Sequence, residues 1–197
     1  MRFFVGLFTS MVLVTTAHAQ STPRPTYTVG DTWKRSNGQE IKVVKVGDDG
    51  YDVVGALVTC PTCVASLDNS GTMLAVSDSG GKPLELTQHG FVPVGAGWKF
   101  FDFPLEPKKT WYISGTAFFR GSPNNYTVDH RVTAYEDVKT KAGTFKAYRI
   151  ERSWTAGTTS NWTETVWWAP AVKSSVKFTS RNPNAREWEL ESYSVKE

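Results

Sequence analysis

One stretch of the chain, residues 139–154 (KTKAGTFKAYRIERSW), constrains the fold more than any other, because a glycine turn leads directly into an alternating strand. Side chains alternate across a β-strand, so Tyr148, Ile150 and Trp154 face one way and their neighbour Arg149 faces the other. The stretches TVDHRVTAY before it and NWTETVWWAP after it alternate in the same way. Three strands joined by short turns predict an antiparallel meander at the centre of the fold.

The rest of the sequence also has the pattern of strands and turns. In the N-terminal half of the chain, Asn37-Gly38 and Asp49-Gly50 are turn pairs between β-rich runs. Nowhere in this half do apolar residues recur at helical spacing over ten positions. We therefore predict an all-β fold. It should be a curved antiparallel sheet, rolled into a half-barrel or a barrel, with meander connections and little helix.

The predicted domain is single and spans residues 27–197, a usual length for one hydrophobic core. Residues 20–26, with two prolines and no apolar side chain, are expected to form a flexible lead-in. The aromatic cluster at Trp98–Phe103 is expected to be a short strand that crosses between the two halves of the domain.

Each predicted strand has one apolar and one polar face, which is typical of an antiparallel sheet with a single solvated side. The apolar faces are formed by Trp111, Ile113, Gly115, Ala117 and Phe119; Val128, His130, Val132 and Ala134; Trp162, Val166 and Trp168; Val176 and Phe178; and Trp188 and Leu190.

Residues 1–19 have the layout of a cleaved secretory signal. They combine Arg2, an apolar run from Phe3 to Val14 that is too short to cross a bilayer, and the end Ala17-His18-Ala19. The next residue is Gln20, so no cysteine follows the cleavage site to carry a lipid. We expect a periplasmic or secreted bacterial protein without a membrane span or a lipid anchor.

The chain contains two cysteines, Cys60 and Cys63, in the phrase CPTC. In an oxidising compartment they should form a disulfide with each other. A redox motif would require a βαβ pattern around them, which this sequence lacks, so the bond is interpreted as a staple of a turn.

The composition restricts the partners. The formal net charge is +3 and the basic residues are interleaved with acids, whereas nucleic-acid binding needs a concentrated basic surface. No nucleic acid is therefore expected as a partner. The chain has 8 Trp and 7 Tyr, and aromatic side chains suit a pleated, half-buried surface.

Nucleophilic catalysis and metal binding have little support. The phrase G-x-S-x-G is absent, and His130 alternates with Val128 and Val132, which favours a core histidine. A metal set could be drawn from Cys60, Cys63, His89 and His130, but their spacing is not that of a metal site and a disulfide would remove the thiolates. We assign no catalytic residue, no metal and no cofactor.

The one group of candidate acid–base residues consists of Glu187, Glu189 and Glu191. Their successive Cα atoms are roughly 6 to 7 Å apart from strand rise, within the range used by glycosidase pairs. All three share one face of one strand, however, and a solvated sheet edge is the favoured interpretation.

The tryptophans are the remaining feature. Trp167 and Trp168 are adjacent in a predicted strand, so they point to opposite faces and one of them should meet solvent or a ligand. Alternatively, Trp167 packs under a loop. The candidate ligand-binding residues are Trp111, Tyr148, Trp154, Trp167, Trp168 and Trp188.

Four phrases occur in order between residues 103 and 193: FPLEPKKTW, VKTKAGTFKAYRI, TVWWAPAVKSSVKF and ELESY. In that order they resemble an uncharacterised group of exported bacterial β-rich proteins, in which FPLxxGKxW precedes AGTFxAxRI, YWYAP and ELxSY. This sequence departs from the group at Lys108, where glycine is usual, and at Val166 and Trp168, where tyrosines are usual. The resemblance implies a curved sheet similar in outline to the half-barrel of periplasmic lipoprotein carriers, and it implies no catalytic residues.

Three functions follow, in order of preference. The first is an exported, non-catalytic binding module that holds a small apolar or lipid-like ligand on an aromatic inner face. The second is a structural or interaction protein of the cell envelope. The third is a hydrolase acting on a carbohydrate or a peptide. A cavity of several hundred Å³ would favour the first, and a filled interior the second.

Overall fold

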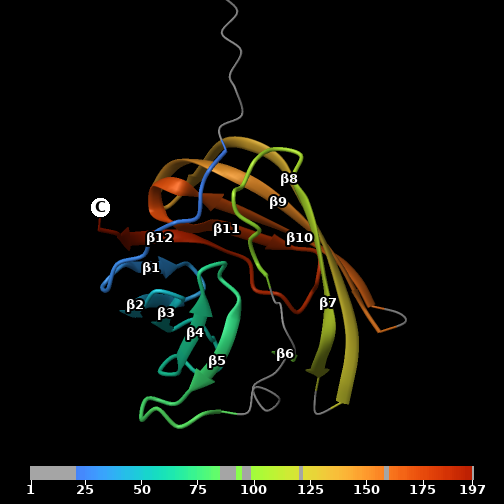
Figure 1. The fold of residues 1–197 in the computed structure, drawn as a ribbon. Coiled ribbons are helices and arrows are strands. Elements are labelled where there is room, and N and C mark those ends of the chain that lie inside the picture. Colours follow the sequence, from blue (N-terminus) through green and yellow to red (C-terminus); the bar gives the residue numbers. More distant parts are fainter. Residues whose placement is uncertain (1–20, 85–91, 95–98, 120–121, 158–159, 197) are drawn as a thin grey trace, which may run out of the picture.

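The computed structural model describes residues 21–84, 92–94, 99–119, 122–157 and 160–196, without the side chains of residues 92–94, 117–119 and 122. The predicted signal, His89 and Trp98 lie outside these residues, as do the side chains of Ala117 and Phe119. The described chain forms one antiparallel sheet of 12 strands, which confirms the all-β prediction (Figure 1). Its helical content there is one 3-10 turn, Pro170–Val172, and no described helix has the length and apolar character needed to cross a membrane.

Two meanders make up the sheet. The first contains β1 (Thr32–Arg35), β2 (Glu40–Val46), β3 (Gly50–Val54), β4 (Val64–Asp68) and β5 (Met73–Ser77). The second contains β6 (Val92–Val94), β7 (Thr110–Phe119), β8 (Ser122–Thr140), β9 (Gly143–Ala156), β10 (Ser160–Ala169), β11 (Ser174–Ser180) and β12 (Trp188–Ser194).

The two meanders join where β1 pairs with β12, with Trp33 opposite Tyr193. The strand order runs from β5 through β1 and β12 to β6, so β5 and β6 are the edges of the sheet. The sheet is curled, with β8 and β9 arching over the first meander, and it is not closed into a barrel (Figure 1). Of the two shapes predicted, the open one is observed.

Irregular pairing accompanies this curvature. The register between β8 and β9 shifts between Val132 and Ala134, and the register between β10 and β11 shifts between Trp167 and Trp168. An extra residue on one strand bends it and increases its twist, so two such positions help long strands to wrap around an interior.

The central turn has the predicted form. Thr140 pairs with Gly143 across the loop of Lys141 and Ala142. Gly143 has a φ of 133°, a region that side-chain-bearing residues rarely adopt, which explains the glycine at the start of β9. The hydroxyl of Thr140 also accepts a hydrogen bond from the Ala142 N–H, at 3.2 Å, and closes the turn.

The predicted crossing strand is wrong. Residues 99–103, called the crossing segment below, follow an irregular path between β6 and β7, and the Phe103–Pro104 peptide bond is cis. Proline lacks the N–H that a sheet ladder requires, which disfavours a strand that leads into it. Leu105, fully buried, ends this segment and exchanges two backbone hydrogen bonds of 2.9 Å with Thr22. The segment predicted as a lead-in is therefore attached to the domain at Thr22.

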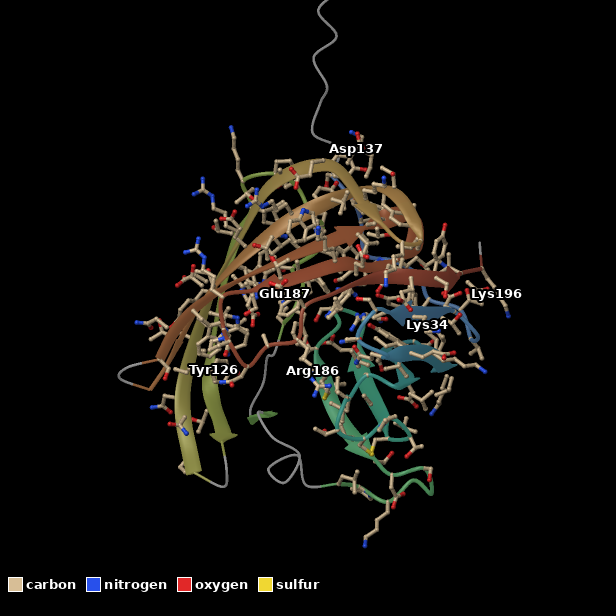
Figure 2. The ribbon with its side chains drawn as sticks, turned by 180° about the vertical axis from the view of Figure 1, so that it is seen from behind. Lys34, Tyr126, Asp137, Arg186, Glu187 and Lys196 are labelled. Carbon is tan, nitrogen blue, oxygen red and sulfur yellow. A yellow bond between two sulfur atoms is a disulfide. The ribbon has the colours of Figure 1, made fainter. Side chains whose placement is uncertain are left out.

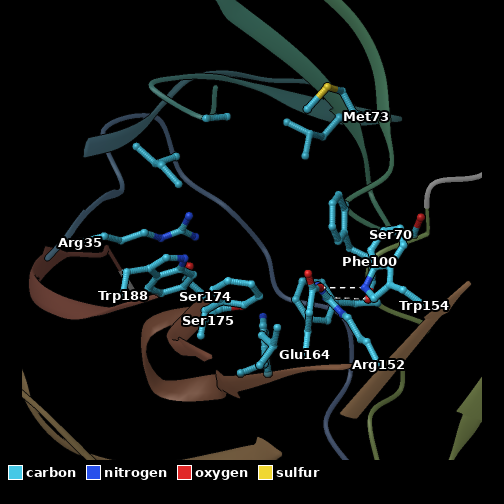
Figure 3. Close-up of a pocket in the computed structure, with 18 of the residues that line it drawn as sticks. Arg35, Ser70, Met73, Phe100, Arg152, Trp154, Glu164, Ser174, Ser175 and Trp188 are labelled. Atoms are coloured by element: carbon cyan, nitrogen blue, oxygen red, sulfur yellow. Dashed lines mark hydrogen bonds between the residues drawn. The ribbon is translucent and has the colours of Figure 1, made fainter. Parts of the chain in front are cut away.

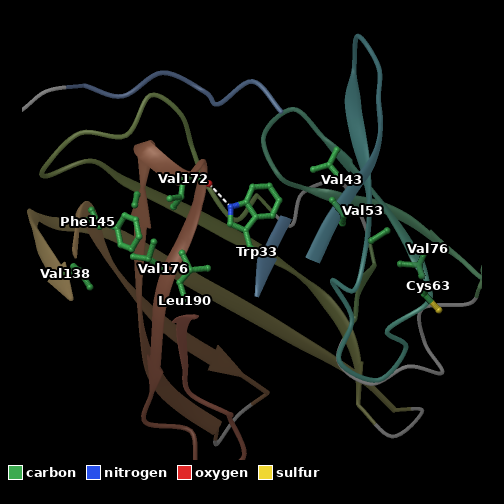
Figure 4. Packing of buried hydrophobic residues seen from close by; sticks show 13 residues of the cluster. Trp33, Val43, Val53, Cys63, Val76, Val138, Phe145, Val172, Val176 and Leu190 are labelled. Carbon is green, nitrogen blue, oxygen red and sulfur yellow. Dashed lines mark hydrogen bonds between the residues drawn. The ribbon is translucent and has the colours of Figure 1, made fainter. Parts of the chain in front are cut away.

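The largest buried cluster joins the two meanders (Figure 4). Trp33 of β1 packs there with Val172, Val176 and Leu190, and its indole N–H donates to the carbonyl oxygen of Val172 at 2.7 Å. Figure 4 shows this indole between Val43 and Val53 of the first meander on one side and Val172 and Val176 on the other. Trp33 thus links the halves of the sheet through both apolar contact and a hydrogen bond.

The predicted disulfide is confirmed. Cys60 and Cys63 are bonded, with their Cα atoms 5.4 Å apart. The backbone N–H of Cys63 donates to the carbonyl oxygen of Cys60 at 3.1 Å, so the bond closes a tight turn. Cys63 is 1% exposed and packs in the cluster of Trp33, which agrees with a structural role.

The convex side of the arch carries charged side chains that point away from the interior, such as Asp137 on β8 (Figure 2). Asp137 accepts a hydrogen bond from Lys146 on β9 at 3.0 Å, and both side chains are more than half exposed. Such exposed pairs contribute little to stability. The concave side differs, and it carries the candidate site.

Candidate functional site

The concave side of the curled sheet encloses an open cleft of about 970 Å³ (Figure 3). Its walls come from both meanders and from the crossing segment. The side of the first meander contributes Tyr27, Trp33 and Tyr51. The crossing segment contributes Phe100, Phe101 and Phe103. The second meander contributes Trp154, Trp162, Trp168, Phe178 and Trp188. The cleft is therefore an aromatic site at the junction of the two halves.

Three of the six residues predicted to bind a ligand line this cleft. Trp154 on β9 and Trp168 on β10 are almost fully buried in its wall, with 6% and 1% exposure. Trp188 opens β12, and its ring is stacked on Phe178 with centroids 6.1 Å apart. The structure brings these indoles together from three strands that the sequence separates.

Trp111 and Tyr148 have places elsewhere in the core. The Trp111 ring is stacked on His130 with centroids 4.6 Å apart. The hydroxyl of the fully buried Tyr148 lies 2.8 Å from the hydroxyl of Thr22, and its ring packs on Tyr135. Neither side chain is among those that line the cleft.

Trp167 lies on the face opposite to Trp168, as the alternation predicts. Its indole N–H donates to the carboxylate of Glu136 at 2.8 Å, and the ammonium of Lys177 lies 5.5 Å from its ring centroid. The side chain is half-buried under these neighbours, Glu136 on β8 and Lys177 on β11. The ring also packs against the buried cluster of Trp33, and it is not among the residues that line the cleft.

A row of polar residues crosses the otherwise apolar inward face at the middle of β8, β9 and β10. In the strand register, His130 of β8 is opposite Arg152 of β9, and Arg152 is opposite Glu164 of β10. Glu164 is in turn opposite Ser180 of β11. Apolar rows flank it on both sides, because Val128 is opposite Trp154 and Val132 is opposite Ile150.

Glu164 is held in the cleft by two tryptophans. One carboxylate oxygen accepts the indole N–H of Trp154 at 2.8 Å, and the other accepts that of Trp162 at 3.1 Å. These indoles are stacked nearly parallel, with centroids 5.3 Å apart. Both oxygens of the carboxylate therefore have a donor, and the two rings are fixed by it (Figure 3).

Arg152 is a buried cation in this row, with 5% exposure. Its guanidinium carbon lies 5.2 Å from the ring centroid of Phe100 and 5.8 Å from that of Phe101. Burial lowers the pKa of Arg152 to about 10, and the negative charge of Glu164 opposes that shift. The guanidinium accordingly remains protonated at neutral pH.

His130 is a core residue, as predicted, with 3% exposure. Burial, together with the positive charge of Arg152, lowers the pKa of His130 to about 3. Its Nδ1 has no hydrogen-bond partner. The imidazole is therefore a neutral ring that packs against Trp111 throughout the physiological pH range.

Arg35 is a second cation in the cleft, beside Trp188 (Figure 3). Its guanidinium carbon lies 3.8 Å from the ring centroid of Trp188, and one terminal nitrogen donates to the side-chain oxygen of Gln39 at 2.7 Å. Burial lowers the pKa of Arg35 to about 9, so this group is also charged at neutral pH.

Arg152 and Glu164 were not among the site residues predicted from the sequence. The signal was present, because Arg152 has the same parity as Tyr148, Ile150 and Trp154 on one strand and must share their inward face. A charged residue among inward positions is uncommon and points to a functional site. The sequence could not show that Glu164 would be its neighbour, since that depends on the register of β9 and β10.

The glutamate ladder lies apart from the cleft. Trp188 lines the cleft, but the neighbouring Glu187, Glu189 and Glu191 do not. Glu164 is the one carboxylate among the described lining residues. Glu191 pairs with Lys141 at 2.8 Å, and Glu187 accepts the backbone N–H of Ser180 at 3.0 Å. Within the described residues, no three or more His, Cys, Asp or Glu side chains are grouped as metal ligands.

The sequence matches no protein-family model and no curated protein. Three solved structures are similar to this chain. A candidate lipoprotein from Parabacteroides distasonis has 15% identity and a TM-score of 0.47, over 89% of this chain and 100% of its own. A candidate exported protein with a YmcC-like fold from Bacteroides fragilis has 14% identity and a TM-score of 0.40, over 90% and 100%. The hypothetical lipoprotein YmcC from Escherichia coli has 12% identity and a TM-score of 0.43, over 95% and 99%. At these scores the similarity assigns no function to the chain, and the resemblance based on sequence phrases stays a prediction.

Proposed function

We propose that this chain is an exported, non-catalytic binding protein that holds an apolar or lipid-like ligand in the aromatic cleft. The single observation that carries the proposal is the cleft itself. Its volume of about 970 Å³ is at the upper end of the range typical of small-molecule sites, and aromatic side chains from three parts of the chain line it. The apparent secretory signal and the Cys60–Cys63 bond support export.

The cleft favours binding over the two alternative functions. A purely structural envelope protein was expected to have a filled interior. A hydrolase of the kind considered would use two carboxyl groups facing each other across a bond. Among the described lining residues Glu164 is the one carboxylate, and two indoles occupy both of its oxygens.

Native mass spectrometry of protein purified from its own source, followed by organic extraction, tests the proposal. We expect a co-purifying apolar molecule that is released on unfolding. Trp188→Ala should reduce its retention because this ring lines the cleft. Trp167→Ala, outside the lining of the cleft, is the matched control and should retain it. Absence of any bound molecule, together with failure to bind added amphiphiles, would refute the proposed function.

A further inference from the structure

Arg152 lacks a full set of partners in the structure. Its Nε has no hydrogen-bond partner, and a terminal nitrogen lies 3.5 Å from the carbonyl oxygen of Phe100, at the limit of a hydrogen bond. A guanidinium has five N–H donors in a fixed fork. A buried charge that is left unpaired is strongly unfavourable, so a fold usually retains one only where something else requires it.

Glu164 does not supply the missing partner. No ion pair joins it to Arg152 in the part of the chain that the structure describes, although the two residues are opposite each other in register. Its oxygens accept the N–H groups of Trp154 and Trp162 instead. Its charge is close enough to act on Arg152, but the hydrogen bonds recorded for its oxygens come from the two indoles and not from the guanidinium.

The charges that line the cleft are predominantly positive. The described lining contains Arg35, Arg152, Lys173 and Arg181 against the single carboxylate of Glu164. Lys173 is already paired with Asp31 at 3.5 Å. The Nε of Arg35 also lacks a partner, but a terminal nitrogen of Arg35 donates to Gln39 at 2.7 Å, whereas the one hydrogen bond recorded for Arg152 is at the 3.5 Å limit. Arg152 is therefore the buried cation best placed to receive an anion from outside.

We infer that the ligand of this cleft is an amphiphile with an anionic headgroup, a carboxylate or a phosphate, whose oxygens accept hydrogen bonds from the Arg152 guanidinium while its apolar chain lies on the aromatic walls. This inference rests on the proposed function and specifies its ligand. Both headgroups present oxygens that match the planar guanidinium fork. The remaining surface of such a ligand is apolar, which suits walls built from Trp168, Phe178 and Trp188.

Tryptophan-fluorescence titrations with three single-chain amphiphiles test the inference, each below its micelle concentration. Palmitate carries a carboxylate, 1-palmitoyl lysophosphatidate carries a phosphate, and 1-monopalmitoylglycerol is neutral. We expect at least one anionic amphiphile to bind more tightly than the neutral one, and their order identifies the headgroup. Inorganic phosphate alone should not compete at equal concentration, because it lacks the apolar chain.

Variants on one strand provide the decisive comparison. Arg152→Met should weaken binding of the anionic amphiphile by roughly ten- to a hundredfold, the usual effect of losing charged hydrogen bonds. It should leave the neutral amphiphile nearly unchanged. Arg152→Lys should fall between the two because it keeps the charge without the fork. Arg149→Met is the matched control, since Arg149 is on the same strand but is paired with Glu151 at 2.9 Å outside the cleft.

The outcomes separate the inference from the proposed function. If all three amphiphiles bind equally, or if Arg152→Met and Arg152→Lys bind the anionic ones as wild type does, the inference is wrong and the binding function stands. If none of the three binds and no molecule co-purifies, both are wrong. If inorganic phosphate competes as strongly as lysophosphatidate does, the cleft holds a simple anion site and the inference of an amphiphilic ligand is wrong.

Discussion

Arg152 and Glu164 are opposite each other on β9 and β10, yet the carboxylate of Glu164 accepts two indole N–H groups and no hydrogen bond from the guanidinium. The pair thus combines a satisfied anion with an incompletely satisfied cation in one buried row. Two opposite charges at this spacing would normally be expected to pair. Their separation leaves Arg152 with unused hydrogen-bonding capacity beside an aromatic cleft.

Replacing Arg152 with methionine should stabilise the fold in the absence of ligand. Methionine has a similar length and no charge, so it removes the cost of burying an incompletely hydrogen-bonded group, about 1 to 3 kcal/mol, while both oxygens of Glu164 keep their indole donors. Urea unfolding of the delipidated protein measures this change. Arg149→Met, which breaks an exposed ion pair, should change stability by less than about 1 kcal/mol.

A loss of stability in Arg152→Met would contradict this expectation. It would mean that the guanidinium is better compensated than its hydrogen bonds indicate. In that case its contacts with the rings of Phe100 and Phe101 would be the principal interactions to examine, because a cation over an aromatic face is itself stabilising.

Replacing Glu164 with glutamine should destabilise the protein by about 1 to 3 kcal/mol, because a side-chain amide has one acceptor oxygen for two indole donors. One of Trp154 and Trp162 would then face an amide N–H. Urea unfolding measures the loss, and Glu151→Gln on the convex side is the control. In an Arg152→Met background the loss should shrink, since no cation then depends on the negative charge. An equal loss in both backgrounds would show that the two charges are uncoupled.

Alternation in the sequence predicted which residues face inward, but it could not predict the cleft. The inward positions of β9 and β10 were identified from spacing, and Trp154 and Trp168 are where that pattern places them. Trp111 has the same parity on its strand as Ile113, yet it packs on His130. The difference depends on how far the sheet curls and on what the crossing segment covers. Those are tertiary distances, which a period of two does not encode.

Replacing Lys108 with glycine should stabilise the folded protein. Its φ is 75°, in the left-handed region, and its N–H donates to the carbonyl oxygen of Val132 at 2.8 Å, so the turn forms despite the lysine. A left-handed conformation costs a residue with a Cβ about 1 to 2 kcal/mol, a cost that glycine avoids. Part of that gain is offset because glycine loses more freedom on folding. We expect Lys108→Gly to increase the unfolding free energy by up to about 1 kcal/mol.

Lys108→Ala separates the backbone effect from the loss of the lysine side chain. Alanine retains the Cβ and therefore the unfavourable φ, so its stability should stay close to that of wild type. Thermal unfolding of the three proteins gives the comparison. Equal stabilisation by alanine and glycine would show that the side chain of Lys108, and not its backbone conformation, is unfavourable.

His130 should make the fold sensitive to mild acid. Burial lowers its pKa to about 3 in the folded state, against about 6.5 for an unperturbed histidine. Between these values the unfolded chain binds the proton and the folded chain does not, so stability falls as the pH decreases. From pH 7 to pH 5 this one group should lower the unfolding free energy by about 2 kcal/mol.

The pH range above 5 isolates His130 from the carboxylates. Hydrogen bonds hold the pKa of Asp68 and of Asp102 below the usual value despite their partial burial, so their contributions to stability are lost only at lower pH. Urea unfolding at pH 7, 6 and 5 should show the slope in wild type and not in His130→Gln. Arg152→Met should reduce it, because the positive charge of Arg152 helps to lower the pKa of His130. The same slope in all three proteins would assign the acid sensitivity to other groups and would mean that the imidazole is protonated without unfolding.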